Sequence, residues 1–424
     1  MSDPAVRILA GSGNAAPRQI SGNRAPMTAL DLFREHGKVV GFAFLLAFLS
    51  SFGQTYFIAL SIPDIRHLHE LSHAEVGMLF AGATMASGLL LSWLGAALDH
   101  RALRHVAAAS LLGLGLASLA LAGAPSVIAL TLAFFGLRLC GQGLLSHAAI
   151  TSTARLPHGI RGRALGITTL GFQAGTAILP AIAGWIIGAS GWVSLWHATA
   201  AASVGCAVLI LLHGPRPAEP TPAAPGEAGA SITRLALAGD PRFLALLPAM
   251  MGPPAIVTGY FFHQRAIGDL LGWSLESLAL AVAVTALTSV ASSVLAGSLI
   301  DRFGAVTRLY LLPLACASAL LPAATGSFGA VGLFLLIGVT SGSSNAIVTA
   351  TLAELYGTRQ LGLVRAQAGT VMIVSSAITP GLMGFGLDRG WGLAPIGTVA
   401  CLFLLAASAL TLCLARPACA GQPS

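Results

Sequence analysis

Charged residues are scarce in this chain of 424 residues. They make up 9% of it, whereas hydrophobic residues make up 55% and the mean hydropathy is +0.83. A water-soluble chain of this length would have too few polar side chains to cover its surface. The composition therefore excludes an ordinary soluble protein and indicates that much of the chain lies in a lipid bilayer.

Patterns that mark metal sites and catalytic centres are also missing. The six cysteines are scattered, and none has the spacing of a metal or redox motif, so they are interpreted as small hydrophobic residues. No His-Glu, Asp-Asp or Ser-Lys arrangement at helical spacing suggests a catalytic pair. The sequence therefore predicts no metal, no cofactor and no catalytic residue, and the protein is not expected to be an enzyme.

Apolar runs of about 20 residues, enough to cross a bilayer as a helix, recur along the chain. Twelve such spans are predicted, at 38–62, 74–98, 104–122, 126–151, 163–189, 192–212, 242–265, 275–299, 305–324, 328–353, 363–388 and 391–415. We expect an all-α membrane protein of twelve transmembrane helices. At the start of the second span, Ser72 and Glu75 form a Ser-x-x-Glu capping box.

An internal repeat divides the spans into two halves of six. Equivalent positions about two hundred residues apart are Gly162, Pro180, Gly184 and Trp192 in one half and Gly362, Pro380, Gly384 and Trp391 in the other. Two six-helix halves are predicted, at 38–212 and 242–415, joined by a proline-rich linker at 213–241. A tail at 1–37 precedes them and a tail at 416–424 follows them. The end of the first tail, at 29–38, suits a short interfacial helix. Pro180 and Pro380 are expected to kink their helices.

A short polar phrase also occurs twice, each time after a long apolar segment. The first copy contains Gly95, Asp99, Arg101 and Arg104, and the second contains Gly297, Asp301, Arg302, Gly304 and Arg308. Both copies resemble the Gly-x-x-x-Asp-Arg-x-Gly-Arg-Arg loop of the major facilitator superfamily. The resemblance implies two pseudo-symmetric six-helix halves that transport a solute by alternating access. It also implies that these motif residues gate the cytoplasmic side, where His100 and Leu103 depart from the pattern in the first copy.

The arginines set the expected orientation. Of 22 basic residues, 18 lie in the two tails and the even-to-odd loops, and only Arg66, Arg265 and Arg389 lie on the opposite face. By the positive-inside rule, both termini should be cytoplasmic in a multi-pass protein of a bacterial inner membrane. This topology also explains the net charge of +7, so a nucleic-acid partner is not expected. We expect a monomer whose partners are lipid and a small-molecule substrate.

Arg138 is the remaining basic residue, and it stands in the middle of the fourth span. A guanidinium there costs at least about 2.5–3.5 kcal/mol unless it faces water or a partner. One interpretation is a site for a carboxylate or phosphate, with Gln142 one turn further on as a second ligand. The alternative is a structural arginine bonded to backbone carbonyls of a neighbouring helix. The phrase Arg138 to Gly143 resembles the fourth-helix motif of the superfamily with its Gln and Gly displaced, which weakens the transfer of a proton-coupling role.

In the superfamily, helices 1, 4, 7 and 10 line the cavity between the halves. Besides Arg138 and Gln142, the candidate substrate-binding residues on these helices are Gln54, Tyr56, Tyr260, His263, Gln264 and Asn345. Ser50, Gln54 and Ser61 would share one face of an α-helix, and Tyr56 would turn away from it. For Gln54, Tyr260 and Asn345, hydrogen bonding between helices is an equal alternative.

No acidic residue lies near the centre of a span, which disfavours the efflux of cationic drugs. One buried cation without a buried anion instead favours a cavity for an anion. We therefore predict a transporter of a small organic anion, with an efflux carrier of neutral amphipathic compounds as the alternative. Coupling to a co-transported proton stays open, because no carrier residue stands out.

Overall fold

The computed structural model describes residues 29–98, 102–215, 237 and 239–413, and within these ranges the regular structure is helical. Eleven helices of the described residues are long and apolar enough to cross a membrane, and Arg308–Ala323 forms a shorter apolar helix between two of them. The predicted all-α membrane fold is confirmed. The predicted tails before residue 29 and after residue 413, most of the linker, and Asp99, His100 and Arg101 lie outside the described residues.

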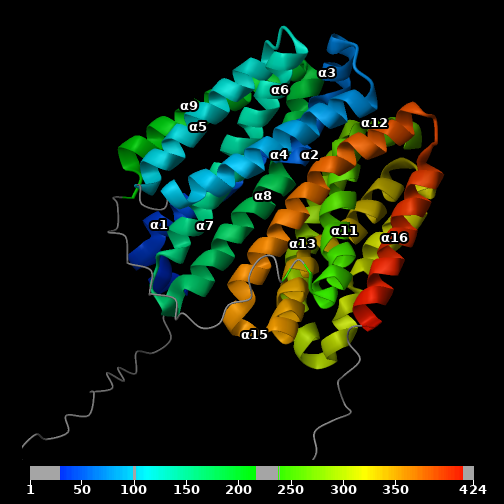
Figure 1. Cartoon of the computed structure of the whole chain (residues 1–424). Helices are drawn as coiled ribbons and strands as arrows, with labels where there is room; N and C mark the ends of the chain where they lie inside the picture. The colour runs from blue at the N-terminus through cyan, green and yellow to red at the C-terminus, as the bar shows by residue number, and fades with distance from the viewer. Residues whose placement is uncertain (1–28, 99–101, 216–236, 238, 414–424) are drawn as a thin grey trace, which may run out of the picture.

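The first half holds six of the eleven candidate membrane spans. Figure 1 shows how they are arranged. Their elements are α1 (Ala29–Leu49), η1 (Ser50–Gly53), α2 (Thr55–Ile58), η2 (Ala59–Ser61) and α3 (Ile62–His69) in the first segment, then α4 (His73–Leu98), α5 (Leu103–Ala122), α6 (Val127–Gly136) continued by η3 (Leu137–Leu145) and α7 (Ser146–Ala154), α8 (His158–Ser190) and α9 (Trp192–His213). The helix α1 begins nine residues before the predicted span, so the expected interfacial helix is its first part. Ser72 and Glu75 make both bonds of the predicted capping box before α4.

The second half repeats the plan with different interruptions. Its elements are α11 (Pro241–Phe262), α12 (Gln264–Leu271), α13 (Leu275–Phe303), η4 (Gly304–Leu311), α14 (Leu312–Leu320), η5 (Leu321–Ala323), α15 (Gly326–Asp388) and α16 (Leu393–Cys413). The predicted tenth and eleventh spans join without a loop in α15, where Gly357 breaks the helix with φ 74° and ψ 164°. A residue with a Cβ would be strained in that conformation, and glycine is not.

The halves lie side by side, with α4 packed on α15 and α8 packed on α13 (Figure 1). A main hydrophobic core runs through both halves and includes Phe80, Phe134 and Phe262. Other large apolar side chains point outward, among them Leu89, Leu116, Leu132, Trp185, Val294 and Leu402. So much exposed apolar surface suits contact with lipid and would be unusual in a soluble protein.

The first transmembrane segment is not one continuous helix. A tight 3-10 turn ends at Gly53, and Gln54 has an extended backbone (φ −82°, ψ 151°) before α2 begins. The interruption changes the helical phase, so the predicted single face of Ser50, Gln54 and Ser61 does not hold. In lipid, such a break requires new partners for the freed backbone groups.

The fourth segment is irregular at the same place, because η3 is a stretch of π-helix. The two irregular stretches pack closely through paired glycines. A Cβ added to Gly53 would stand 2.7 Å from the Gly141 Cα and 2.6 Å from the Gln142 backbone nitrogen, and a Cβ added to Gly141 would stand 2.6 Å from the Gly53 Cα. Only glycine at both positions permits this approach.

We predict that Gly53→Ala and Gly141→Ala each lower the thermal unfolding temperature of the purified protein by several degrees, since overpacking costs about 1–3 kcal/mol. The matched control is Gly41→Ala in α1, where an added Cβ meets no atom within 4 Å. That variant should unfold at or slightly above the wild-type temperature. Equal unfolding temperatures for Gly53→Ala and Gly41→Ala would contradict the packing described for the break.

Candidate functional site

Arg138 lies in η3 and points its guanidinium at the break in the first segment. Its Nη1 donates to the Gly53 carbonyl and to the Thr55 hydroxyl, both at 3.3 Å. The guanidinium carbon also lies 5.2 Å from the ring centre of Phe80. Arg138 is only 5% exposed, and its Nε has no hydrogen-bond partner in the part of the chain that the structure describes. These partners carry no net charge, so within the described residues the charge of Arg138 has no acidic partner.

Two glutamine candidates lie at the same junction. Gln54 supplies the extended residue of the break, and Gln142 follows the glycine that packs against it. The Oε1 of Gln142 is buried and has no partner among the described residues. The structure thus places Gln142 and Gln54 at the junction that holds Arg138, through irregular backbone and not through a shared helical face. Thr55, which helps to hold Arg138, was missed because an isolated threonine in an apolar run gives no signal.

The candidates on the seventh segment lie elsewhere, at the end of the bundle where α3 and α12 meet. Gln264 is fully buried and donates from Nε2 to the Tyr56 carbonyl at 2.7 Å, which joins the two halves. His263 is 2% exposed, and its Nε2 lies 2.8 Å from the Pro380 carbonyl. Tyr260 is buried too, and its hydroxyl has no partner among the described residues. These side chains are packed between helices in this conformation.

Asn345 of α15 is exposed, and its Oδ1 accepts a hydrogen bond from Arg365 at 3.4 Å. Arg365 is exposed as well and was interpreted from the sequence only as a topology charge. The polar partner of Arg365 is therefore Asn345, which lies before the kink of the same long helix α15. Its placement could not be derived from helical spacing, because the kink at Gly357 separates the two residues.

The first copy of the repeated motif is described only in part. Gly95 lies in the last turns of α4, and Arg104 is the second residue of α5, where its Nε donates to Nε2 of His105 at 3.3 Å. Asp99 and Arg101 fall outside the described residues. Gating by the first copy therefore stays a prediction.

In the second copy, Gly297, Asp301 and Arg302 lie on the exposed side of α13. The guanidinium of Arg302 lies 5.3 Å from the Phe303 ring centre. Within the described residues, neither Asp301 nor Arg302 forms an ion pair with the first half. Their gating role also stays a prediction.

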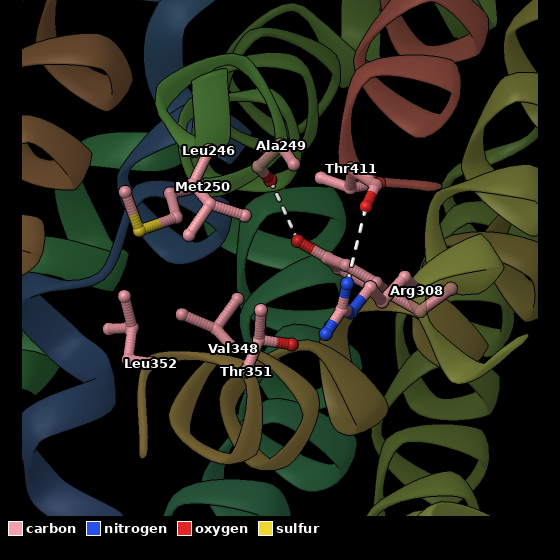
Figure 2. Close-up of a pocket in the computed structure, with 9 residues that line it drawn as sticks. Leu246, Ala249, Met250, Arg308, Val348, Thr351, Leu352 and Thr411 are labelled. Atoms are coloured by element: carbon pink, nitrogen blue, oxygen red, sulfur yellow. Dashed lines mark hydrogen bonds between the residues drawn. The ribbon is translucent and has the colours of Figure 1, made fainter. Parts of the chain in front are cut away.

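The last arginine of that copy, Arg308, is buried instead (Figure 2). Its Nη2 pairs with Glu354 of α15 at 2.7 Å, and its Nη1 points at the Thr411 carbonyl of α16 at 3.5 Å. Beside it, the Tyr310 hydroxyl donates to the Ala249 carbonyl of α11 at 2.8 Å. These bonds enclose a small pocket within the second half and tie four of its segments together.

Polar bonds close the end of the bundle at α3 and α12, which we call the closed end. The Asp388 carboxylate, from the second half, accepts from the backbone nitrogens of His73 and Ala74 at 2.9 and 2.7 Å. It thereby caps α4 of the first half, where an anion is favoured by the helix dipole. Arg265 pairs with Asp64 at 3.0 Å and donates to the Leu60 carbonyl at 2.9 Å.

The architecture and this interface define a helical membrane transporter, with two halves that meet around polar residues on broken helices. The sequence profile of the Major Facilitator Superfamily matches residues 43–380, so the chain belongs to that family of transporters. No curated protein matches the chain by sequence.

Solved structures show the same fold. A bacterial homologue of the human lysosomal transporter Spinster, in an inward-facing and unoccupied conformation, aligns with a TM-score of 0.71 at 16% identity, over 90% of this chain and 97% of the homologue. A structure of such a homologue in an inward-facing and occupied conformation aligns with a TM-score of 0.66 at 14% identity, over 91% and 97% of the two chains. The predicted membership of the superfamily is confirmed.

We predict that Asp388→Asn weakens the closed end, because a carboxylate at a helix N-terminus contributes about 0.3–1 kcal/mol. The measurement is the distance between spin labels at Leu68 and Phe328, two exposed residues on opposite halves, in a cysteine-free background. The population of longer distances should rise roughly two- to five-fold. Glu75→Gln is the control, since it removes a carboxylate from the same helix end without touching the second half. A similar rise in both variants would show that closure does not depend on Asp388.

Proposed function

We propose that this transporter moves a small organic anion and that Arg138 receives the anionic group. The observation that carries the proposal is the state of Arg138, a buried cation whose described partners are a carbonyl, a hydroxyl and an aromatic ring. Neutral oxygens orient a guanidinium without neutralising it. A carboxylate that reached Arg138 would form charge-assisted bonds, which are about twice as strong as neutral ones.

The junction of the two irregular segments supplies further ligands in this proposal. Gln142 has an unused buried oxygen, which can accept from a hydroxyl or amide of the cargo, and Gln54 lies at the break itself. Asn345 would contribute from the second half. Broken helices at the centre of a transporter are typical of substrate sites, because their free backbone groups can bind solutes.

The candidates at the closed end would act in another conformation. Four candidates are buried among helices here, namely Tyr56, Tyr260, His263 and Gln264. They would contact cargo only after the closed end opens. The repeated motif would hold the opposite end shut in that state, as the family resemblance implies. Alternating access would then move the cargo past Arg138.

The arginine distribution supports a place in a bacterial inner membrane with both termini cytoplasmic. In that orientation the closed end faces outward. It carries Arg66, Arg265 and Arg389, the three basic residues that the topology leaves outside. The protein would work as a monomer in this proposal, since each chain contains both halves.

One observation favours a second candidate function. The bond between Arg138 and the Gly53 carbonyl is what a purely structural arginine would make. If that is its whole role, the cargo needs no anionic group. The second candidate is therefore an efflux carrier of neutral amphipathic compounds.

We predict that an organic anion, found in a panel of carboxylates, phosphates, sugars and lipophilic cations, raises the thermal stability of the purified protein. Bound ligand at one hundred times its dissociation constant stabilises by about 2.7 kcal/mol. Arg138→Gln should weaken that anion about 10- to 100-fold, since a hydrogen bond to a charged group contributes about 1.5–3 kcal/mol. Glutamine places an uncharged amide where Nε of Arg138 stands, so the variant removes the guanidinium and its charge and keeps a polar group at the site.

The matched control is Arg389→Gln, which removes an exposed arginine at the end of α15. Anion binding should be unchanged in this variant. Stabilisation by neutral amphiphiles alone, equal in wild type and Arg138→Gln, would contradict the anion proposal and favour the second candidate.

A further inference from the structure

Two histidines from opposite halves face each other at the closed end. His73 is the first residue of α4, and His263 stands between α11 and α12, yet their ring centres lie 5.7 Å apart. The sequence separates them by almost two hundred positions and gives no sign of the pairing. Phe262 packs against His263 with ring centres 5.0 Å apart, which keeps the pair in an apolar setting.

The hydrogen bonds fix which nitrogen of each ring carries a proton. Nη1 of Arg66 lies 2.7 Å from Nε2 of His73. A guanidinium only donates, so this Nε2 accepts and the proton of a neutral His73 is on Nδ1. Nε2 of His263 lies 2.8 Å from the Pro380 carbonyl, which only accepts, so here Nε2 carries the proton and Nδ1 is bare.

The two Nδ1 atoms are therefore complementary, one a donor and one an acceptor. Both are buried, and neither has a hydrogen-bond partner among the described residues. A buried pair of this kind suits a direct bond or a bridging water when both rings are neutral. When that bond or bridge is made, all four ring nitrogens are occupied, and neither ring keeps a free lone pair for an additional proton.

The charged groups around the pair come from each neighbouring element. Arg66 of α3 and Asp388 of α15 act electrostatically on both rings, and His73 acts on His263. The two carboxylate oxygens of Asp388 accept hydrogen bonds from the backbone nitrogens of His73 and Ala74. Arg66 stays charged, because a guanidinium keeps its proton in proteins. The neutral pair thus sits beside one cation and one anion whose oxygens are already bonded.

We propose that His73 and His263 form a proton-binding site whose occupation opens the closed end. A proton has two places to bind, and closure blocks both. Nε2 of His73 is covered by Arg66, and Nδ1 of His263 is buried beside the His73 ring, with the ring centres 5.7 Å apart. Protonation of His73 would set its Nε2–H against the Arg66 guanidinium, and protonation of His263 would leave a buried N–H without an acceptor and add a cation beside Arg66. Proton binding and closure therefore exclude each other.

The direction of the pH effect follows. The closed form holds neutral rings, and the open form exposes rings that titrate near the usual histidine pKa of about 6.5. Acidification through that range favours opening, and the closed form is favoured at higher pH. The inference rests on the proposed alternating-access function and adds a residue pair that can take up a proton during the cycle.

The test uses the full-length protein without cargo and the spin-label pair at Leu68 and Phe328. Between pH 8 and pH 5, the ratio of long to short distances should rise, by at most about ten-fold per pH unit for each proton bound. His73→Gln and His263→Gln should each reduce the pH response, and the double variant should abolish it. Glutamine can accept from Arg66 or donate to Pro380, but it does not titrate.

His67→Gln is the matched control, because His67 is an exposed histidine of α3 at the same end. It should retain the wild-type pH response. If the histidine variants do not fold, Arg66→Gln serves instead, and because it uncovers Nε2 of His73 in the closed form, it should weaken the pH response of opening. An unchanged distance from pH 8 to pH 5 in wild type, a response that survives in the double variant, or a full wild-type response in Arg66→Gln would overturn the inference.

Because no cargo is present, these results do not depend on the anion proposal. A protein that binds anions through Arg138 but has a pH-independent closed end would contradict the histidine site alone. A protein that shows the pH response but binds no anion would contradict the cargo proposal alone.

Discussion

The bond from Arg138 to the Gly53 carbonyl is the interaction on which the centre of this transporter depends. A broken helix in a bilayer leaves backbone groups that need partners, and a buried guanidinium needs oxygens around it. Each irregularity satisfies the other. The paired glycines at 53 and 141 bring the two backbones close enough for this exchange. The result is a cation that is held in place and yet keeps its charge, which is the property an anion site requires.

The closed end is held in a similar way, because polar groups of one half bond to backbone or charged groups of the other half. Asp388 caps α4, Gln264 bonds the Tyr56 carbonyl, and Arg265 pairs with Asp64. These groups are partly exposed to solvent or lie at helix ends, so each contributes only modestly to the free energy of closure. The two halves can therefore separate. A gate built from one deeply buried ion pair would resist opening, because an unpaired buried charge is costly. The closed end instead suits a structure that must cycle between two states.

Much of the fold could be predicted from the sequence, because the signals involved are local. Apolar runs mark the spans, the twofold repeat marks the halves, and Ser72 with Glu75 marks the start of α4. A lone arginine in an apolar span identified Arg138. The rest could not be predicted, because helical periodicity assumes an unbroken α-helix. The break at Gln54, the π-helical stretch after Gly136 and the joined segments at Gly357 all depend on packing between distant parts of the chain. The same holds for His73 and His263, which meet only when the halves close.

The most direct measurement of the central claim is a cryo-electron microscopy structure of the protein with its stabilising anion bound. The account predicts density for a carboxylate or phosphate beside Gln142 and within hydrogen-bonding distance of the Arg138 guanidinium, whose Nε has no partner among the described residues. The anion would share or replace the Gly53 carbonyl as the partner of Arg138. An anion bound elsewhere, with Arg138 still held only by Gly53 and Thr55, would contradict the account.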